Sequence, residues 1–325
     1  MAKDELILNP QNLRPHIVLL GAGASLAALP NGDKHGKLLP VMDNFVQVLE
    51  LEDDLLNTNI DPSGNFEKIY SQITDDALKN LIENKIYNYF SNLELPYTVT
   101  DYDRLLLSLR EKDAIFTFNS DPFLFDAYMR NREKGVTLPE IFFLHGNVRL
   151  LACPDHYRFG HHPGICDDCG KNFVAVPLLY PIETKDYQNT VNYTKVSWEK
   201  AQNRFTEAFT ITIFGYGAPN SDVEAVDLLK KAWLKESARE MEHIEIIDND
   251  KQAILANRWK SFAPTNHYHI VNNLRKSRLW RWPRRSCESL FYPMSQGIPC
   301  EAFPLPETED HDELQKYIRQ IASYE

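Results

Sequence analysis

Three apolar runs, each followed at once by a turn of small or polar residues, constrain this chain more than any other feature. The runs are Ile17–Leu20, Ala114–Phe116 and Ile141–Phe143. Runs of this kind are typical of buried strands in a parallel sheet. The turns that follow are Gly21–Ser25, Thr117–Asp121 and Leu144–Asn147. Because open α/β sheets bind ligands just beyond the carboxyl ends of their strands, the sequence predicts one crevice that collects a glycine turn, an Asn, an Asp and a His.

The rest of the chain extends this pattern into a doubly wound, Rossmann-like parallel sheet of the α/β class. Two further strands are expected at Thr210–Tyr216 and His243–Ile247, each before a helical pattern. A mainly helical stretch, about 41–111, separates the first two strands and is expected to be an insertion. We therefore predict a sheet domain over 1–272, which includes this insertion and a small Cys- and His-rich module at about 151–176. An extension over 273–325 follows and ends in an amphipathic helix.

Composition argues against several classes of protein. The formal net charge of −11 makes nucleic acid an unfavourable primary ligand. No apolar stretch approaches the ~18 residues of a membrane span, and the start of the sequence lacks the apolar core of a signal peptide. We therefore expect a cytoplasmic protein with no membrane partner. Five cysteines, an odd number, argue against a disulfide framework.

The first turn has the elements of a phosphate cradle. Gly21 and Gly23 would let the backbone approach a pyrophosphate, and the N–H groups of the following helix would face it. Ser25 would add a hydroxyl hydrogen bond. The full dinucleotide fingerprint is absent, because Leu26 fills the place of its last glycine. A plain tight turn is the alternative interpretation.

Asn119 and His145 are the expected catalytic residues, and Asp121 beside them is expected to bind the cofactor. A neutral imidazole can take a proton from a ribose hydroxyl near neutral pH. Asn119 can hold a hydroxyl or a water without titrating, and Asp121 can accept hydrogen bonds from a carboxamide. Such a set suits cleavage of a bond to a sugar carbon that breaks with oxocarbenium character. The alternative is structural, since Asn and Asp are common turn formers and a His at a strand end can be a turn residue.

A Cys-x2-His pair and a Cys-x2-Cys pair predict a metal site. The pairs are Cys153 with His156 and Cys166 with Cys169. Four sulfur and nitrogen ligands close the tetrahedral shell of a structural Zn²⁺ and leave no open position for catalysis. His161 and His162 are rivals of His156 as the nitrogen ligand. A reduced loop without metal is the alternative.

The turns after the last two predicted strands are candidates for holding the rest of a nucleotide. Gly215, Gly217 and Ser221 follow one strand, and Asp248 follows the other. Small residues permit a ligand to approach the backbone closely. Helix capping, for which Asp222 is well suited, is the alternative explanation.

One strongly basic tract, residues 275–285, stands out in an acidic chain and also contains Trp280 and Trp282. Arg and Trp together can bind nucleic acid, a phosphate ligand or an acidic protein face. A solvated surface is the common alternative, although the two tryptophans favour packing or an interface. The sequence does not choose between these roles.

The motifs, in this order, resemble those of the Sir2 (sirtuin) superfamily. They are Gly-Ala-Gly-Ala-Ser at 21–25, Thr-Phe-Asn-Ser-Asp at 117–121, His-Gly at 145–146 and the cysteine module that follows. The resemblance covers about 17–250 and implies that the chain binds NAD. It implies that the phosphates and the adjoining ribose lie at Gly21, Ala22, Gly23 and Ser25. It also implies that His145 is the base, that Asn119 orients the ribose or a water, and that the later turns hold the adenosine half.

Two departures favour one branch of this superfamily. Protein-deacylating sirtuins carry a Gly-Ile-Pro-Asp-Phe-Arg run after the first turn, whereas residues 28–35 here keep the Pro but lack the Phe and the Arg. The long helical insertion also differs from a compact sirtuin. The resemblance therefore implies a Sir2-like NAD hydrolase of the kind found in prokaryotic defence proteins. The alternatives are an NAD-dependent deacylase or ADP-ribosyltransferase, and a non-catalytic NAD-sensing subunit; the trigger, a protein partner and a homo-oligomer stay open.

Overall fold

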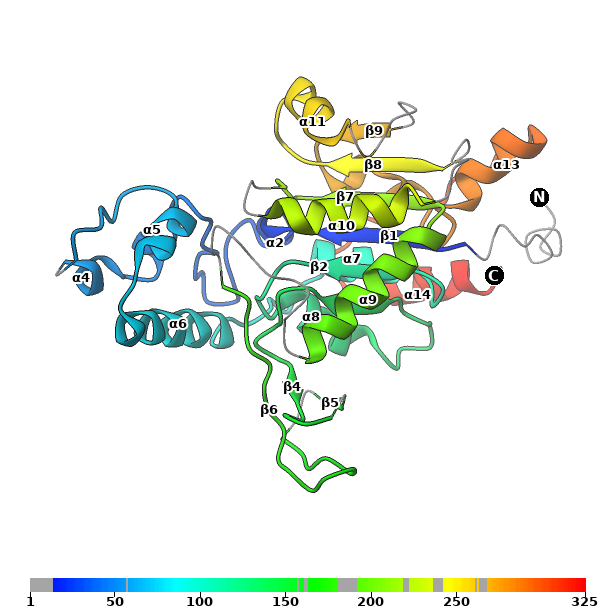
Figure 1. Cartoon of the computed structure of the whole chain (residues 1–325). Helices are drawn as coiled ribbons and strands as arrows, with labels where there is room; N and C mark the ends of the chain where they lie inside the picture. Colours follow the sequence, from blue (N-terminus) through cyan, green and yellow to red (C-terminus); the bar gives the residue numbers. More distant parts are fainter. Residues whose placement is uncertain are drawn as a thin grey trace.

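A six-stranded parallel sheet organises the chain (Figure 1). The computed structural model describes residues 14–325 except 57, 157, 161–162, 181–191, 219–221, 236–241, 261 and 263–267. The strands are β1 (His16–Leu20), β2 (Ala114–Thr117), β3 (Glu140–Phe143), β7 (Thr210–Phe214), β8 (His243–Ile247) and β9 (Tyr268–Val271). Their order is β3-β2-β1-β7-β8-β9, and all neighbours are parallel. The predicted doubly wound sheet is confirmed, and its strand order reverses between β1 and β7.

Helices cover both faces of this sheet, which explains why its strands read as continuous apolar runs. Val18 and Leu20 of β1 join an apolar cluster with α2 (Ala22–Ala28), α7 (Asp101–Leu107) and α8 (Phe123–Asn131). Ile17 and Leu19 face the opposite cluster, with α9 (Asn192–Glu207), α10 (Val223–Trp233) and α11 (Gln252–Trp259). The edge strand β9, Tyr-His-Ile-Val, is too mixed in polarity for its pattern to have predicted it.

The insertion after α2 is a helical block with an apolar cluster of its own. Its helices are α3 (Phe45–Val48), α4 (Glu52–Leu55), α5 (Phe66–Gln72) and α6 (Asp76–Ser91). In Figure 1, α4, α5 and α6 project beyond one end of the main sheet. The helical pattern expected around 41–56 is interrupted, because Glu50 has a φ of 52° between α3 and α4, outside the right-handed helical region. Helix α7 lies within the predicted insertion but packs on the sheet.

Two further segments complete the fold. Strands β4 (Leu151–Ala152), β5 (Phe159–Gly160) and β6 (Val174–Ala175) form a small antiparallel sheet apart from the main one. The C-terminal segment contains η3 (Leu274–Lys276), α12 (Arg278–Arg281), α13 (Glu288–Gln296) and α14 (His311–Ala322). Leu279 of α12 and Leu314 of α14 join the cluster on the sheet, so this extension packs on the main core. No helix in the described part of the chain combines the length and apolarity needed to cross a bilayer.

Candidate functional site

A cavity of about 350 Å³ lies where the strand order reverses, at the carboxyl ends of β1, β2, β3 and β7. Of the predicted site residues, those that line it are Gly21, Ala22, Ser25, Asn119, Asp121, His145, Gly215 and Gly217. Gly23 and Asp248 are not among the lining residues, and Ser221 lies outside the described residues. The strand ends therefore bring together most of the residues that the motifs singled out, as expected for the reversal point of a doubly wound sheet.

The helical block supplies an apolar wall that the sequence did not predict. Its contributions are Leu39, Pro40, Met42, Phe45, Ile86 and Phe90, and Leu178, Leu179 and Tyr180 extend the wall from the segment after β6. None of the described lining residues is a lysine or an arginine, whereas Glu67, Asp121 and Asp222 are acidic. The described cavity therefore combines an apolar side with a polar side. The acidic groups of the polar side favour a ligand with positive rather than negative charge.

The turn after β1 and the turn after β7 pack against each other through their glycines. The N–H of Gly21 donates to the carbonyl oxygen of Phe214 at 3.1 Å, and the N–H of Gly23 donates to that of Gly215 at 2.9 Å. A Cβ at Gly215, which has a φ of +60°, would lie 2.2 Å from the nitrogen of Ala24. These glycines are thus required by contact between backbones. The N–H groups of Gly21 and Gly23 therefore both donate within the protein.

A buried hydrogen-bond network stands at the polar end of the cavity. The Nδ2 of Asn119 donates to the carbonyl oxygen of Gly21 at 2.8 Å and lies 2.9 Å from the Oγ of Ser25. The Ser25 hydroxyl donates to Oδ2 of Asp121 at 2.6 Å. A residue that the motifs missed, Tyr102 of α7, places its hydroxyl 2.6 Å from the same Ser25 Oγ. The network holds three motif residues that follow β1 and β2, namely Ser25, Asn119 and Asp121, in fixed relative positions.

Asp121 is fully enclosed in this network. Burial raises the pKa of its carboxyl to about 6, against the opposing effect of the hydrogen bonds from Ser25 and from the N–H of Phe123. Its backbone oxygen accepts a 2.7 Å hydrogen bond from the side chain of Asn147, in the turn after β3. The carboxyl group can therefore change its protonation near neutral pH, which is unusual for an aspartate.

His145 enters the cavity from the turn after β3 and is mostly buried. Its ring meets that of Phe118 edge to face, with centroids 4.8 Å apart, and Phe118 stacks on Tyr216 at 4.3 Å. The Tyr216 hydroxyl lies 3.0 Å from Oδ2 of Asp222, which precedes α10. These aromatic rings hold the imidazole beside the polar network. Phe118 lies inside the Thr-x-Asn motif, so its position next to Asn119 was the signal that could have indicated it.

The residue after His145 joins the site to the cysteine module. Gly146 has a φ of +77°, and a Cβ there would lie 2.7 Å from the carbonyl oxygen of Pro177. The N–H of Leu179 donates to the carbonyl oxygen of His145 at 2.9 Å. The segment after β6 is thus packed on the His-Gly pair, and its Leu178 and Leu179 line the cavity.

The four predicted metal ligands converge in this module. Cys153, His156, Cys166 and Cys169 offer ligand atoms that all lie within 4.8 Å of one another. The Cys153 sulfur lies 3.5 Å from that of Cys169 and 3.6 Å from Nδ1 of His156. Zinc bonds of ordinary length give tetrahedral edges of about 3.5–3.8 Å, so the residues fit a structural Zn²⁺.

One of the four ligands, Cys153, is biased toward the form that binds a cation. Burial, which raises the pKa of the Cys153 thiol, is outweighed by hydrogen bonds from the Asp155 N–H and the His156 ring, so this pKa falls to about 6. The thiolate is the form that binds metal. A closed set of three sulfurs and one nitrogen would hold the chain rather than activate a substrate. The rival ligands His161 and His162 lie outside the described residues.

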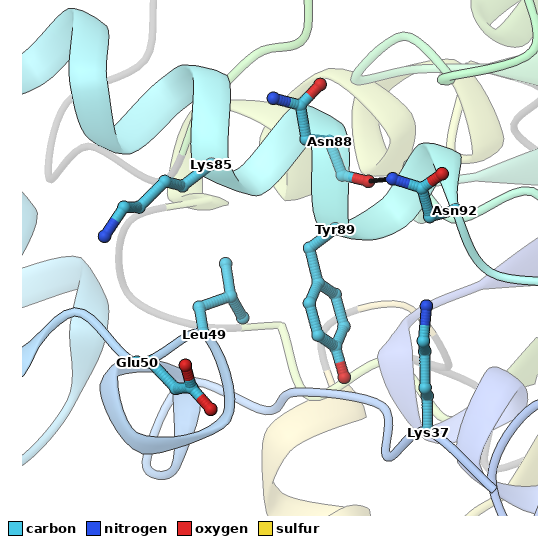
Figure 2. A pocket seen from close by; sticks show the side chains of 7 residues that line it. All are labelled: Lys37, Leu49, Glu50, Lys85, Asn88, Tyr89 and Asn92. Carbon is cyan, nitrogen blue, oxygen red and sulfur yellow. Dashed lines mark hydrogen bonds between the residues drawn. The ribbon is translucent and has the colours of Figure 1, made fainter.

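A second pocket, of about 380 Å³, opens on another face of α6 (Figure 2). Its lining residues are Lys37, Leu49, Glu50, Lys85, Asn88, Tyr89 and Asn92. Figure 2 shows Tyr89 extending from α6 toward the side of Leu49 and Glu50, whereas Asn88 points away from them. Lys85 forms an ion pair with Asp54, and the Tyr89 hydroxyl donates to the carbonyl oxygen of Leu38. None of the predicted site residues lines this pocket, so the strand-end cavity is the candidate active site.

The basic tract lies away from that cavity and divides into buried and exposed parts. Arg284 is almost fully buried, and its guanidinium donates to the carbonyl oxygens of Leu109 and Thr137. Trp280 is buried beneath Arg104, whereas Arg281 is exposed and lies over the ring of Trp282. Much of the tract therefore packs the C-terminal extension onto the sheet.

Comparison with known proteins finds similarity to solved structures of Sir2 homologues. No protein-family profile matches the chain, and no curated protein matches it. The similar solved structures include a mutant Sir2 homologue in complex with ADP-ribose, at 12% identity and a TM-score of 0.38, with 98% of this chain and 99% of that chain covered. A structure from work on the mechanism and regulation of Sir2 enzymes shares 10% identity, covers 95% and 94%, and has a TM-score of 0.39. A Sir2 homologue in complex with NAD shares 13% identity, covers 97% and 95%, and has a TM-score of 0.34.

Proposed function

We propose that this chain is a Sir2-like enzyme that hydrolyses NAD to ADP-ribose and nicotinamide in the strand-end cavity. The observation that carries the proposal is the convergence of Ser25, Asn119, Asp121 and His145 on one cavity at the reversal point of the sheet. These residues come from three separate motifs and lie more than a hundred positions apart at the extremes. The resemblance of the motifs to the Sir2 superfamily supplies the reaction class, and the geometry supplies a place for it.

The proposed chemistry needs little from the protein beyond positioning and electrostatics. The bond between the ribose C1 and the pyridinium nitrogen breaks, and its electron pair leaves with nicotinamide. A positive charge then develops on the ribose, and the acidic residues Glu67, Asp121 and Asp222 line the cavity where this charge would be stabilised. A water adds to C1 and loses a proton to His145, which acts as the base.

Asn119 is the residue that we propose to hold the reacting ribose hydroxyl or the water. Its Nδ2 is committed to partners within the protein, so its Oδ1 is the atom left to face the cavity. That oxygen accepts a hydrogen bond and does not titrate, so the position it defines is independent of pH. The apolar wall from the helical block would exclude other waters from the bond that breaks.

The charge of the lining also suggests how a dinucleotide would be oriented. The described lining has no lysine or arginine for a diphosphate, and the N–H groups of Gly21 and Gly23 are already used. The described cavity therefore suits the nicotinamide ribose half of NAD. We propose that the diphosphate and the adenosine half lie outward, toward Gly217 and the turn after β7.

We propose hydrolysis rather than deacylation because the sequence after the first turn departs from the run found in protein-deacylating sirtuins. In the structure, the segment that replaces the Phe-Arg run is a tight turn in which Oδ1 of Asp33 accepts hydrogen bonds from the N–H groups of His35 and Lys37. Placement among prokaryotic defence proteins rests on the sequence resemblance alone. A structural Zn²⁺ in the cysteine module would hold the wall formed by Leu178 and Leu179.

Product analysis tests this proposal. The full chain is incubated with NAD, with and without an acetyl-lysine peptide, and the products are separated by chromatography. We expect free ADP-ribose and nicotinamide in equal amounts without peptide. Turnover that requires the peptide and yields O-acetyl-ADP-ribose would identify a deacylase. Saturable NAD binding without turnover, in a preparation with its metal in place, would identify a sensor.

A further inference from the structure

Tyr102 reaches the catalytic network from outside the strand-end motifs. It lies in the first turn of α7, has no solvent exposure, and directs its hydroxyl between Ser25 and Asn119. The Tyr102 Oη is 2.6 Å from Ser25 Oγ and 3.2 Å from Asn119 Nδ2. Burial beside Asp121 raises the pKa of the Tyr102 phenol above its usual value, so the hydroxyl keeps its proton and can donate it.

The directions of the hydrogen bonds in this network follow from the partners. The carbonyl oxygen of Gly21 only accepts, so the atom of Asn119 that faces it must be Nδ2 and its Oδ1 points elsewhere. An ionised Asp121 carboxylate also only accepts, so Ser25 donates its single hydroxyl proton to it. The Tyr102 hydroxyl must then donate to Ser25 Oγ and accept from Asn119. The chain of donors runs from Tyr102 through Ser25 to Asp121.

Helix α7 is anchored by the two residues that follow Tyr102. The next residue, Asp103, is fully buried and accepts hydrogen bonds from Arg130 at 2.9 Å and from Asn131 at 2.7 Å, both on α8. Arg104 donates to the carbonyl oxygen of Thr308 in the C-terminal segment at 2.7 Å. Because the two residues after Tyr102 are tied to different elements, the first turn of α7 is held in place and the Tyr102 hydroxyl has little freedom to leave its partners.

We propose that Tyr102 is a positioning residue for the reaction, which holds Ser25 and fixes the Asn119 carboxamide so that its Oδ1 faces the substrate cavity. The inference rests on the proposed function, and it adds a residue that no strand-end motif contains. A phenylalanine at this position would keep the packing but remove the donor to Ser25. The Asn119 Nδ2 would lose one acceptor, and its carboxamide would be held less firmly.

Asp121 gives a readout of this role that does not depend on turnover. Its carboxyl is approached by Ser25 from α2, Tyr102 from α7 and Asp126 from α8, and His145 shares its cavity. The Tyr102 hydrogen bond polarises the Ser25 hydroxyl and so strengthens its bond to the carboxylate. Loss of the Tyr102 hydroxyl should therefore favour the protonated carboxyl and move its titration midpoint to higher pH.

The experiment compares wild type with Tyr102→Phe, and uses Tyr70→Phe as a matched control. Tyr70 is a similarly buried tyrosine whose hydroxyl donates to Glu83 within the helical block, and it does not line the cavity. Two quantities are measured: the rate of nicotinamide release against NAD concentration, and the titration of the Asp121 carboxyl by infrared spectroscopy on protein with ¹³C-labelled aspartate. An Asp121→Asn spectrum assigns the band.

We expect Tyr102→Phe to lower kcat about tenfold or more with a small change in KM, and to raise the carboxyl midpoint. Tyr70→Phe should leave both quantities at their wild-type values. A Tyr102→Phe protein with wild-type kcat and an unmoved midpoint would overturn the inference. If wild type released no nicotinamide but the midpoint still moved, the proposed function would fail while the coupling of Tyr102 to Asp121 stood.

A second variant covers the case in which Tyr102→Phe does not fold. Replacing Tyr102 with 3-fluorotyrosine keeps the shape of the ring and makes the hydroxyl a stronger donor. The Asp121 midpoint should then move to lower pH, opposite to the shift expected for Tyr102→Phe. An unchanged midpoint in a folded fluorotyrosine protein would contradict the proposed hydrogen-bond chain.

Discussion

The backbone N–H of Gly23 donates a 2.9 Å hydrogen bond to the carbonyl oxygen of Gly215, which joins the turn after β1 to the turn after β7. These two turns flank the point at which the sheet reverses its strand order. Gly21 and Gly215 line the cavity and Gly23 does not. The glycine turn that resembles a nucleotide cradle therefore first serves to let two backbones meet.

This contact predicts different outcomes for two glycines in one turn. In Gly215→Ala, the new methyl group would lie 2.2 Å from the Ala24 nitrogen at a φ of +60°, so the turns must separate. We expect a loss of about 3 kcal/mol or more in the free energy of unfolding. In the control Gly217→Ala, the methyl group meets nothing within 4 Å, and the change should stay below about 0.5 kcal/mol. Urea unfolding measures both, and equal losses would contradict the packing role.

The cysteine cluster predicts one zinc ion per chain. A strong chelator should remove it and lower the thermal midpoint, because a structural metal contributes folding free energy. Cys166→Ser should prevent full retention of the metal, whereas Cys300→Ser, which changes a cysteine outside the cluster, should not. Elemental analysis of freshly purified protein checks the stoichiometry. Protein that contains no metal and melts at the same temperature with chelator would rule out the site.

A buried histidine predicts part of the acid sensitivity of the fold. His16 lies between Ser286 and Thr212, with ring nitrogens 2.6 and 2.8 Å from their hydroxyls, and burial lowers its pKa from 6.5 to about 3. Between these values the unfolded chain binds one more proton than the folded chain. The contribution of His16 to the free energy of unfolding is therefore fully present above about pH 6.5 and is lost as the pH falls toward 3.

The His16 contribution should be about 1 kcal/mol smaller at pH 5.5 than at pH 7.5. His16→Gln keeps polar groups at this position but does not titrate, so it should lose less stability over the same interval. Urea unfolding of both proteins at the two pH values gives the difference. An identical loss in wild type and variant would show that His16 is not the group responsible.

The fold followed from the sequence because its strands are buried on both faces. Residues such as Ile17 and Val18 point to opposite clusters, so both had to be apolar and the run was unmistakable. The edge strand β9 is only partly buried, and its pattern carried no comparable signal. The break between α3 and α4 at Glu50 could not be predicted either, because nothing in the sequence marks a glutamate that adopts a left-handed conformation.

The site was predicted where chemistry and sequence position coincide, and missed where they do not. Asn119 and His145 follow strands directly, so topology alone brings them together. Tyr102 reaches Ser25 only because α7 folds back onto α2, which no local pattern encodes. Sequence also does not separate a glycine needed by a ligand from one needed by another backbone; Gly23 meets the backbone of Gly215, and its assignment to a phosphate stays a prediction. Asp248 follows β8 but does not line the cavity.

The rate of nicotinamide release from NAD, without any peptide, tests the central claim most directly. It is measured for wild type, Asn119→Ala and His145→Ala, with thermal unfolding curves recorded for each protein. We expect wild type to release nicotinamide and each variant to be slower by about 10²–10⁴, because a positioned base or a positioned acceptor is lost while the fold is kept. Variants that melt like wild type and release nicotinamide at the wild-type rate would contradict the assignment of this cavity as the active site.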